Sequence, residues 1–207
     1  IVFEGVEGCG KSYQSKKLKK NLQKKGVHSI LTREPGGTKS AESIRTLILK
    51  DYFLKDKKEK FDKYTDTLLY LAARNEHIKN RIQPALNKKK IVICDRFVDS
   101  TLAYQVYGKG VNAGLVNAVH KYILKNAKPD LTFILKVNIS KAFKRLNKRK
   151  KKNRYDKFSR NFYSKVQNAF IKISKKNKKK YIVLDNSKDS EEIENTIFKK
   201  TLSKIKK

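Results

Sequence analysis

A glycine-rich segment near the start of the chain has the residue types that bind phosphate groups. It reads Gly5-Val6-Glu7-Gly8-Cys9-Gly10-Lys11-Ser12 and fits the pattern GxxxxGK[ST]. Glycines let backbone N–H groups surround an anion, because no side chain stands in the way. The lysine can bridge the β- and γ-phosphates of a nucleotide, and the following hydroxyl can ligate Mg²⁺. An apolar run precedes the segment and a helical pattern follows it, so we expect a P-loop that binds a nucleoside triphosphate. The P-loop alone does not name the reaction, because GTPases, motor ATPases and kinases all contain it.

Two further apolar runs end in an arginine beside a carboxylate. Arg33 and Glu34 follow one run, and Asp95 and Arg96 end another. The carboxyl ends of parallel strands lie at one edge of a sheet, which is where ligands bind. There a carboxylate can hold Mg²⁺ directly or through water, and an arginine can neutralise a transferring or accepting phosphate. Together with the P-loop, the two pairs favour phosphoryl transfer over ordinary surface ion pairs.

A helical pattern further along the chain places an aromatic ring beside an arginine. Tyr70 and Arg74 are four residues apart and therefore share a helix face. Such a face can stack a planar base on the ring and hydrogen-bond the base edge with the guanidinium. From the residues alone, however, we expect Tyr70 to be a core residue rather than a base platform. We expect His77 to be a polar residue on the exposed side of this helix.

The elements that must position these residues follow from hydrophobic patterning. Short β-branched runs predict five strands at 1–5, 27–32, 91–95, 131–137 and 181–185. Helical patterns lie between and after them, at 11–25, 40–50, 62–86, 112–126, 140–150, 159–176 and 189–206. This alternation predicts an α/β fold, a doubly wound five-stranded parallel sheet with helices on both faces. No linker divides the chain, so we expect one domain over 1–207, with a short mobile lid at about 148–158.

Composition limits the partners of this chain. Its 52 Lys and Arg residues against 19 Asp and Glu residues give a formal charge of +33, which raises the possibility of nucleic-acid binding. The lysines recur in almost every segment, without a localised basic and aromatic stripe, so we expect a solvated surface and no specific nucleic acid. Neither cysteine has the spacing of a metal site. No apolar run is long enough for a membrane span, no signal peptide is visible, and we expect a cytoplasmic protein with a few residues before Ile1.

The motifs occur in the order found in the thymidylate kinase family, and nearly the whole chain resembles the bacterial branch of that family. The segments that carry the resemblance are FEGVEGCGKS, TREPGGT, LLYLAARNEH, ICDRFVDSTLAYQ, KPDLTFILKV and NRYDKFSRNFYSKVQNAF. REPGGT and DRxxDSTxAYQ are far more specific than the P-loop alone. The resemblance implies ATP-dependent phosphorylation of dTMP to dTDP with Mg²⁺, in a homodimer that packs through helices such as the one around 62–86.

The resemblance also implies a role for individual residues. Those expected to act in phosphoryl transfer are Lys11, Asp95, Arg96 and Arg154. Residues 5–12 would bind ATP together with Arg149 and Arg154 of the lid, and the Mg²⁺ ligands would be Ser12, Glu34 and Asp95, partly through water. The residues expected to bind dTMP are Glu7, Arg33, Glu34, Tyr70, Arg74, Arg96, Ser100, Thr101, Tyr104 and Gln105. Tyr70 replaces the usual phenylalanine, so its hydroxyl needs room or a partner.

Three alternatives stay open at this level. The first alternative is a kinase whose acceptor is another nucleotide or a deoxynucleoside, which Arg74, Tyr104 and Gln105 disfavour. The second alternative is a basic nucleic-acid-binding ATPase, which the scattered lysines disfavour. The third alternative is an inactive homologue, which disagrees with the presence of every charged group that the reaction needs.

Overall fold

Five parallel strands form the centre of the molecule, as the sequence predicts. The computed structural model describes residues 1–49, 60–148, 154–187 and 190–205. The strands are β1 (Val2–Glu4), β2 (Ser29–Arg33), β3 (Ile91–Asp95), β4 (Thr132–Lys136) and β5 (Tyr181–Asp185), and they lie in the order β2-β3-β1-β4-β5. The connections leaving β1 and β4 run in opposite directions, so the carboxyl ends of these neighbours mark the switch point where such sheets bind ligands.

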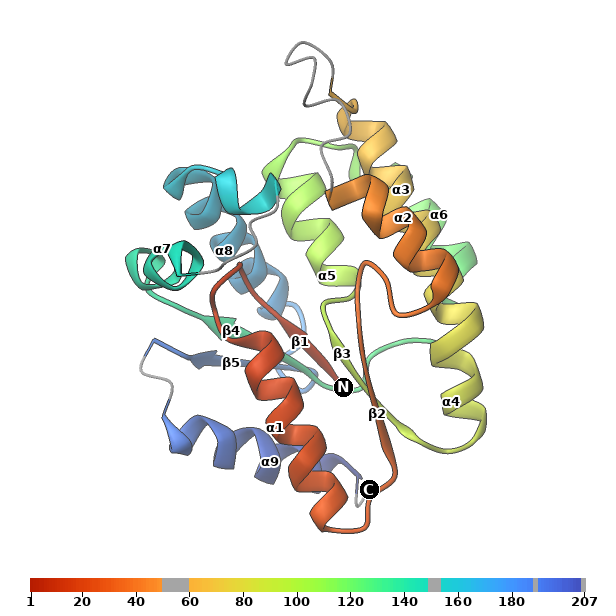
Figure 1. The fold of residues 1–207 in the computed structure, drawn as a ribbon, viewed down its shortest axis with the longest axis vertical. Helices are drawn as coiled ribbons and strands as arrows, with labels where there is room; N and C mark the ends of the chain where they lie inside the picture. Colours follow the sequence, from red (N-terminus) through yellow and green to blue (C-terminus); the bar gives the residue numbers. More distant parts are fainter. Residues whose placement is uncertain (50–59, 149–153, 188–189, 206–207) are drawn as a thin grey trace.

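The buried apolar side chains around the sheet form two clusters. Phe3 stacks on Phe133 with ring centroids 5.3 Å apart, in a core that includes Leu18 of α1 (Lys11–Lys24) and Ile197 of α9 (Glu191–Ile205). Val2 belongs to a second cluster, with Val92 and with Ile78 and Ile82 beyond helix α3. Helices α1 and α9 lie together in front of the sheet in Figure 1, and α8 (Arg160–Ser174) lies behind it. Helices on both faces are thus confirmed.

The other helices follow the predicted order, with two differences. They are α2 (Lys39–Leu49), α3 (Lys63–His77), α4 (Gln83–Asn87), α5 (Val98–Thr101), α6 (Ala113–Leu124) and α7 (Ile139–Asn147). The single helix expected over 62–86 is α3, a π-helical turn Ile78–Ile82 and α4. Pro84 lies in the first turn of α4, where its missing N–H is tolerated, and it would clash inside a continuous α-helix.

The second difference is a helix that the sequence analysis missed. Helix α5 continues as a π-helical segment over Leu102–Gly108. Its first turn has no side-chain cap from a neighbouring residue. Instead, the carboxylate of Glu4 on β1 accepts hydrogen bonds from the N–H groups of Phe97, at 2.8 Å, and Ser100, at 3.1 Å. Because the cap comes from the first strand, no local pattern signals the start of this helix.

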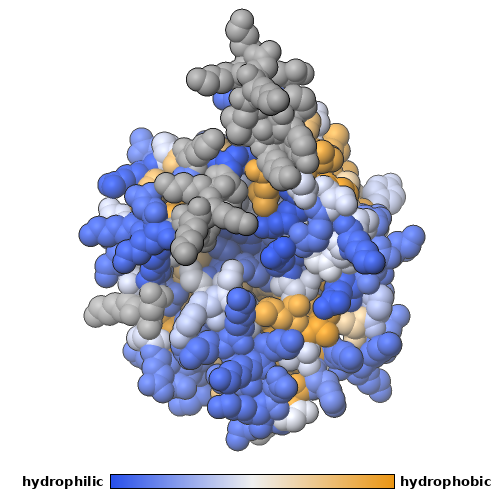
Figure 2. Space-filling model, viewed as in Figure 1, coloured by the Kyte–Doolittle hydropathy of each residue, from blue (hydrophilic) through white to orange (hydrophobic). Residues whose placement is uncertain are grey.

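The surface agrees with the expected solvated lysines. The face seen in Figure 2 is mostly hydrophilic, and its apolar spots are small. Both cysteines are free thiols and buried. None of the helices in the described ranges combines the length and the apolar character needed to cross a membrane.

Candidate active site

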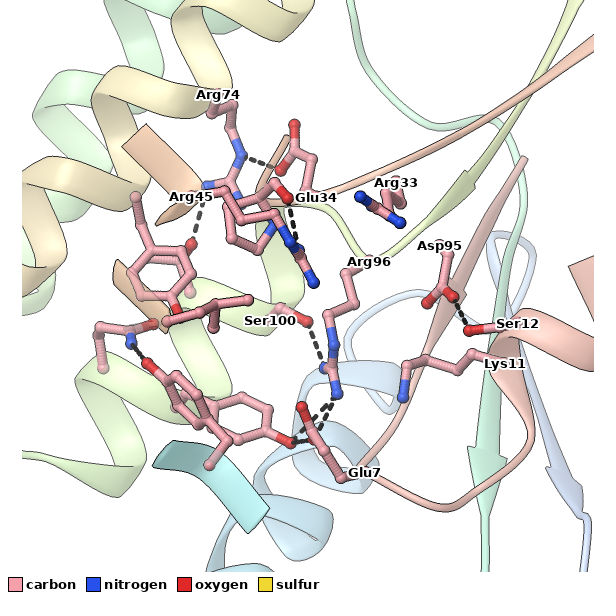
Figure 3. Close-up of a pocket in the computed structure, with 17 residues that line it drawn as sticks. Glu7, Lys11, Ser12, Arg33, Glu34, Arg45, Arg74, Asp95, Arg96 and Ser100 are labelled. Atoms are coloured by element: carbon pink, nitrogen blue, oxygen red, sulfur yellow. Dashed lines mark hydrogen bonds and ion pairs between the residues drawn. The ribbon is translucent and has the colours of Figure 1, made fainter. Parts of the chain in front are cut away.

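A cleft of about 210 Å³ opens at the carboxyl ends of β1, β2 and β3 (Figure 3). All the residues predicted to bind the acceptor line it, together with Lys11, Ser12 and Asp95 of the predicted donor side. The sequence analysis did not select the remaining lining residues, which are Pro35, Arg45, Leu49 and Tyr155. In Figure 3, Arg96 lies between Lys11 on one side and Ser100 on the other, so one guanidinium separates the two halves of the cleft.

The P-loop has the backbone geometry that its glycines predict. Gly5, Gly8 and Gly10 have φ angles of 138°, 74° and 97°, and a Cβ on Gly8 would lie 2.7 Å from the carbonyl oxygen of Ala142. Helix α1 begins directly after Gly10, so its N-terminal N–H groups face the loop. The Lys11 ammonium donates to the carbonyl oxygens of Val6, at 2.8 Å, and Gly5, at 3.1 Å.

Two residues from the far end of the chain support this loop, and the sequence analysis missed both. Arg145 on α7 donates to the carbonyl oxygen of Gly8 at 3.0 Å. Asn186, which comes directly after β5 and is fully buried, donates from Nδ2 to the carbonyl oxygen of Cys9 at 2.8 Å. A polar residue just after a strand is the signal that marks Asn186, and the same signal led to Arg33 and Asp95.

Ser12 and Asp95, two of the predicted Mg²⁺ ligands, are in contact. The Ser12 hydroxyl donates to Asp95 Oδ2. The described residues contain no group of three or more His, Cys, Asp or Glu side chains able to hold a metal ion. A hydroxyl and one carboxylate suit Mg²⁺, which keeps several waters and binds substrate phosphates rather than a cage of protein side chains.

Glu34, the third predicted ligand, lies in a buried polar cluster. Its Oε2 accepts from Arg74 Nε at 2.7 Å, and its Oε1 lies 3.0 Å from His77 Nδ1. The other His77 nitrogen lies 2.6 Å from the Thr32 hydroxyl, and the ring is fully buried. The exposed position expected for His77 is therefore wrong. The backbone at Gly37 packs against the His77 ring, so the histidine fills the space beneath the REPGGT loop.

Arg74 is almost completely engaged by protein acceptors. Its Nη1 lies 2.8 Å from the Thr101 hydroxyl and 2.7 Å from His120 Nε2, and its Nη2 donates to the Phe97 carbonyl oxygen at 2.9 Å. Burial and the Arg74 charge lower the pKa of His120 to about 3, so this ring is neutral and accepts the hydrogen bond. Arg74 thus connects α3 to α5 and α6 at the base of the cleft, in addition to lining it.

Arg96 is positioned by three side chains of the predicted acceptor site. Its Nη2 donates to Glu7 Oε2 at 2.5 Å, and its Nη1 donates to the Ser100 hydroxyl at 2.9 Å. The Tyr104 hydroxyl donates to the same Glu7 oxygen at 2.5 Å, and its ring centre lies 5.1 Å from the guanidinium carbon. Arg96 has a φ of 71°, an uncommon left-handed backbone for a non-glycine residue. Such strain persists where the surroundings impose it, and it directs this side chain into the cleft.

Glu4, which no sequence argument selected, holds the turn after Arg96. It is fully buried, and its Oε2 accepts from the Ser100 hydroxyl at 2.6 Å. Burial raises the pKa of Glu4 to about 8, and the nearby Asp99 carboxylate adds to this shift. An acid inside an apolar strand is the signal for such a residue, because a buried carboxyl group requires partners.

A raised pKa makes the stability of the fold depend on Glu4 in a defined pH range. The folded state favours the protonated form, so its contribution to stability falls as pH rises from 4.5, the ordinary pKa, through about 8. Glu4→Gln keeps an oxygen for the two N–H groups, and its amide N–H resembles the protonated acid if the Ser100 hydroxyl turns to accept. A neutral side chain should therefore reduce this decline. Urea unfolding midpoints between about pH 5 and 9 measure the effect.

The control for this experiment is Glu192→Gln, which changes an exposed carboxylate on α9. It should follow the pH profile of the unchanged protein. Parallel profiles for the unchanged protein and Glu4→Gln would contradict the expected protonation of Glu4.

The predicted lid arginines are the residues that the structure supports least. Arg149 lies outside the described residues. Arg154 donates from Nη2 to Asp66 Oδ1, and its guanidinium carbon lies 5.1 Å from the centre of the Tyr155 ring. Tyr155 lines the cleft, whereas Arg154 is not among the described residues that line it. In this structure Arg154 is therefore paired with Asp66, and its expected role at the ATP phosphates stays a prediction.

These features define a class of protein. A parallel sheet with a P-loop after β1, and a cationic cleft beside a set of aromatic rings, is the arrangement of a P-loop kinase with a nucleotide acceptor.

Comparisons with known proteins identify the family. The family model described as thymidylate kinase matches residues 3–197. A thymidylate kinase of Mycoplasma capricolum is 40% identical over 100% of this chain and 95% of its own length, and one of Wolbachia pipientis wMel is 43% identical over 84% of each chain. The crystal structure of thymidylate kinase from Ehrlichia chaffeensis superposes with a TM-score of 0.71 at 33% identity, covering 100% of this chain and 97% of that one. The chain belongs to the thymidylate kinase family, whose members are ATP-dependent transferases that phosphorylate dTMP to dTDP.

Proposed function

We propose that this chain transfers the γ-phosphoryl group of ATP to the phosphate of dTMP, giving dTDP and ADP, in the cleft between the P-loop and α3. The observation that carries the proposal is the position of Arg96. This guanidinium shares one cleft with the P-loop lysine and is held in place by Glu7 and Ser100. An acceptor phosphate bound there lies between a site for triphosphate and a pocket with aromatic walls.

On the donor side, the backbone N–H groups of residues 5–12 and the N-terminus of α1 bind the phosphates of ATP. Lys11 exchanges the carbonyl oxygens of Gly5 and Val6 for phosphate oxygens, because an anion is the stronger acceptor. Ser12 and Asp95 would hold Mg²⁺, and the ion would supply positive charge to neutralise the phosphate oxygens. The protein makes no covalent bond to the phosphoryl group, so positioning and charge neutralisation supply the catalysis.

On the acceptor side, Arg96 binds the dTMP phosphate, and Arg33 lies near the same place. Tyr70 stacks on the thymine, with Thr101 and Gln105 at the base edge. The Tyr104 ring, 4% exposed and bonded to Glu7, packs against the sugar where a ribose 2′-hydroxyl would need space. These contacts favour a deoxynucleotide.

The reaction is tested by coupled detection of ADP with a panel of acceptors. Turnover with dTMP should exceed that with dCMP, UMP and AMP. Equal or greater turnover with any of these three would reject the proposed acceptor. Hydrolysis of ATP that is stimulated by DNA and weakened by salt would favour the nucleic-acid-binding ATPase instead.

The assembly proposed is a homodimer in the cytoplasm. Large apolar side chains are exposed on three adjacent helices, Leu47 of α2, Tyr64 and Leu68 of α3, and Tyr122 of α6 (Figure 1). Covering such side chains with a second copy removes apolar surface from water. Light scattering should give twice the mass of one chain, and a monomer at micromolar concentration would reject the dimer.

A further inference from the structure

A histidine that the proposed reaction does not use lies directly against Arg74. His120 on α6 is 5% exposed, and it is not among the described residues that line the cleft. Its Nε2 lies 2.7 Å from Nη1 of Arg74, which is hydrogen-bond distance. A guanidinium has only donors, so the imidazole nitrogen must be the acceptor, with Nε2 unprotonated and the ring proton on Nδ1. His120 is therefore a neutral acceptor held against a buried cation.

The hydrogen bonds of Arg74 fix the plane of its guanidinium. Four of its five N–H groups have acceptors, which are Glu34, Thr101, His120 and the Phe97 carbonyl group. These acceptors belong to four parts of the fold: the loop after β2, helix α5, helix α6 and the turn after β3. Within the part of the chain that the structure describes, the fifth N–H, the second one on Nη2, has no acceptor.

This remaining N–H gives the base end of the cleft a defined chemistry. Arg74 lines the cleft with Tyr70, and Figure 3 shows it beside Glu34 at the end away from Lys11. In this orientation the arginine offers a base one donor and no acceptor. Thymine has a carbonyl oxygen at position 4, which accepts, whereas cytosine has an amino group there, which donates. A guanidinium that turned within the cleft would lose its contact with His120.

We propose that His120 is a positioning residue for acceptor selection. By accepting from Nη1, it holds the guanidinium plane of Arg74, so that a single N–H meets the base and favours a carbonyl oxygen over an amino group. This inference rests on the proposed function, which assigns this end of the cleft to thymine. It adds a residue of α6, outside all the motifs that carry the family resemblance, to those that determine the acceptor.

The test compares His120→Leu with His120→Gln in steady-state kinetics and in calorimetric titration with dTMP alone. Leucine has no acceptor, so the KM and the Kd for dTMP should rise by about 10- to 100-fold, the factor that corresponds to one hydrogen bond of a charged group. The amide oxygen of glutamine can accept from Nη1, so His120→Gln should bind dTMP within about threefold of the unchanged protein. An equal loss in both variants would overturn the inference.

Two further measurements separate positioning from general loss of stability. In His120→Leu, kcat at saturating dTMP and the KM for ATP should change by less than about threefold, because the phosphates bind elsewhere in the cleft. The preference for dTMP over dCMP should fall by about tenfold or more, since the amino group of dCMP gains nothing from the Arg74 N–H. An unchanged preference would contradict the role in selection.

Two control variants match these changes. His28→Leu is the same substitution at an exposed histidine directly before β2, and Val116→Ala removes buried apolar atoms from the same helix as His120. Both should leave the KM for dTMP unchanged, although Val116→Ala should lower the melting temperature. If Val116→Ala raised the KM as much as His120→Leu does, lost stability would explain the effect and the inference would be rejected.

A second substitution covers the case in which leucine prevents folding. Methionine adapts to irregular space and has only a weak acceptor, so His120→Met should show the same rise in the KM for dTMP. An unchanged KM in a folded His120→Leu or His120→Met would overturn the inference.

The proposed function and the inference fail in different ways. If the unchanged protein does not bind dTMP, the acceptor assignment is rejected, and the inference is rejected with it. If the unchanged protein binds dTMP and the His120 variants bind it equally well, only the role of His120 is rejected.

Discussion

Replacing Lys11 with Met should lower kcat/KM by about 10³-fold or more, because the ammonium is the cation that the P-loop places at the β- and γ-phosphates. Its Nζ already lies between two loop carbonyl oxygens, at 2.8 and 3.1 Å, and the side chain is 7% exposed. Methionine fills a similar volume without the charge. The loss of hydrogen bonds to these carbonyl groups should cost only about 1 kcal/mol of stability each.

Coupled ADP release at saturating dTMP measures this effect, and thermal unfolding measures the stability. The control is Lys20→Met, which removes an exposed ammonium from the same helix. It should retain full activity. Activity of Lys11→Met within about tenfold of the unchanged protein would exclude Lys11 from the transfer step.

Replacing Arg96 with Asn should lower kcat/KM for dTMP by about 10²- to 10³-fold, with little change in the affinity for ATP alone. The guanidinium is the group that separates the donor and acceptor halves of the cleft, and Glu7, Ser100 and Tyr104 all contact it. Asparagine is chosen because it tolerates the φ of 71° at this position better than most residues. Backbone strain therefore does not account for the loss.

A second basic residue with left-handed backbone provides the control. Lys89 has a φ of 52° and is exposed, and Lys89→Asn makes the same kind of change away from the cleft. It should leave the kinetics unchanged. Titration with an ATP analogue separates the two halves of the site, and a large loss of its affinity in Arg96→Asn would contradict the assignment of Arg96 to the acceptor.

The sequence analysis predicted the strands well because short, nearly continuous apolar runs bounded by polar residues belong to buried parallel strands. All five predicted strands correspond to β1–β5, with shifts of only a residue or two at their ends. The residues expected at the carboxyl ends of β2 and β3 meet in one cleft for the same reason, since neighbouring parallel strands all end at the same edge of the sheet.

The errors arose where a buried polar group finds its partner far along the chain. His77 was expected to be exposed, but its ring is buried in contact with Thr32 and Glu34, which lie about forty residues earlier. Helix α5 was missed because Glu4, from the first strand, caps it. The pairing of Arg154 with Asp66 spans 88 residues, and a local sequence pattern gives no sign of it either.

The sequence by itself determined the P-loop, the strands and the order of the motifs, because backbone conformation and hydrophobic periodicity are properties of neighbouring residues. The tertiary structure alone decided which acidic residue pairs with which arginine around the cleft. Glu7 with Arg96, Glu34 with Arg74, and Asp66 with Arg154 join different parts of the chain. A buried ionic group must be satisfied by whatever the packing brings beside it, and that choice is made only when the sheet and helices come together.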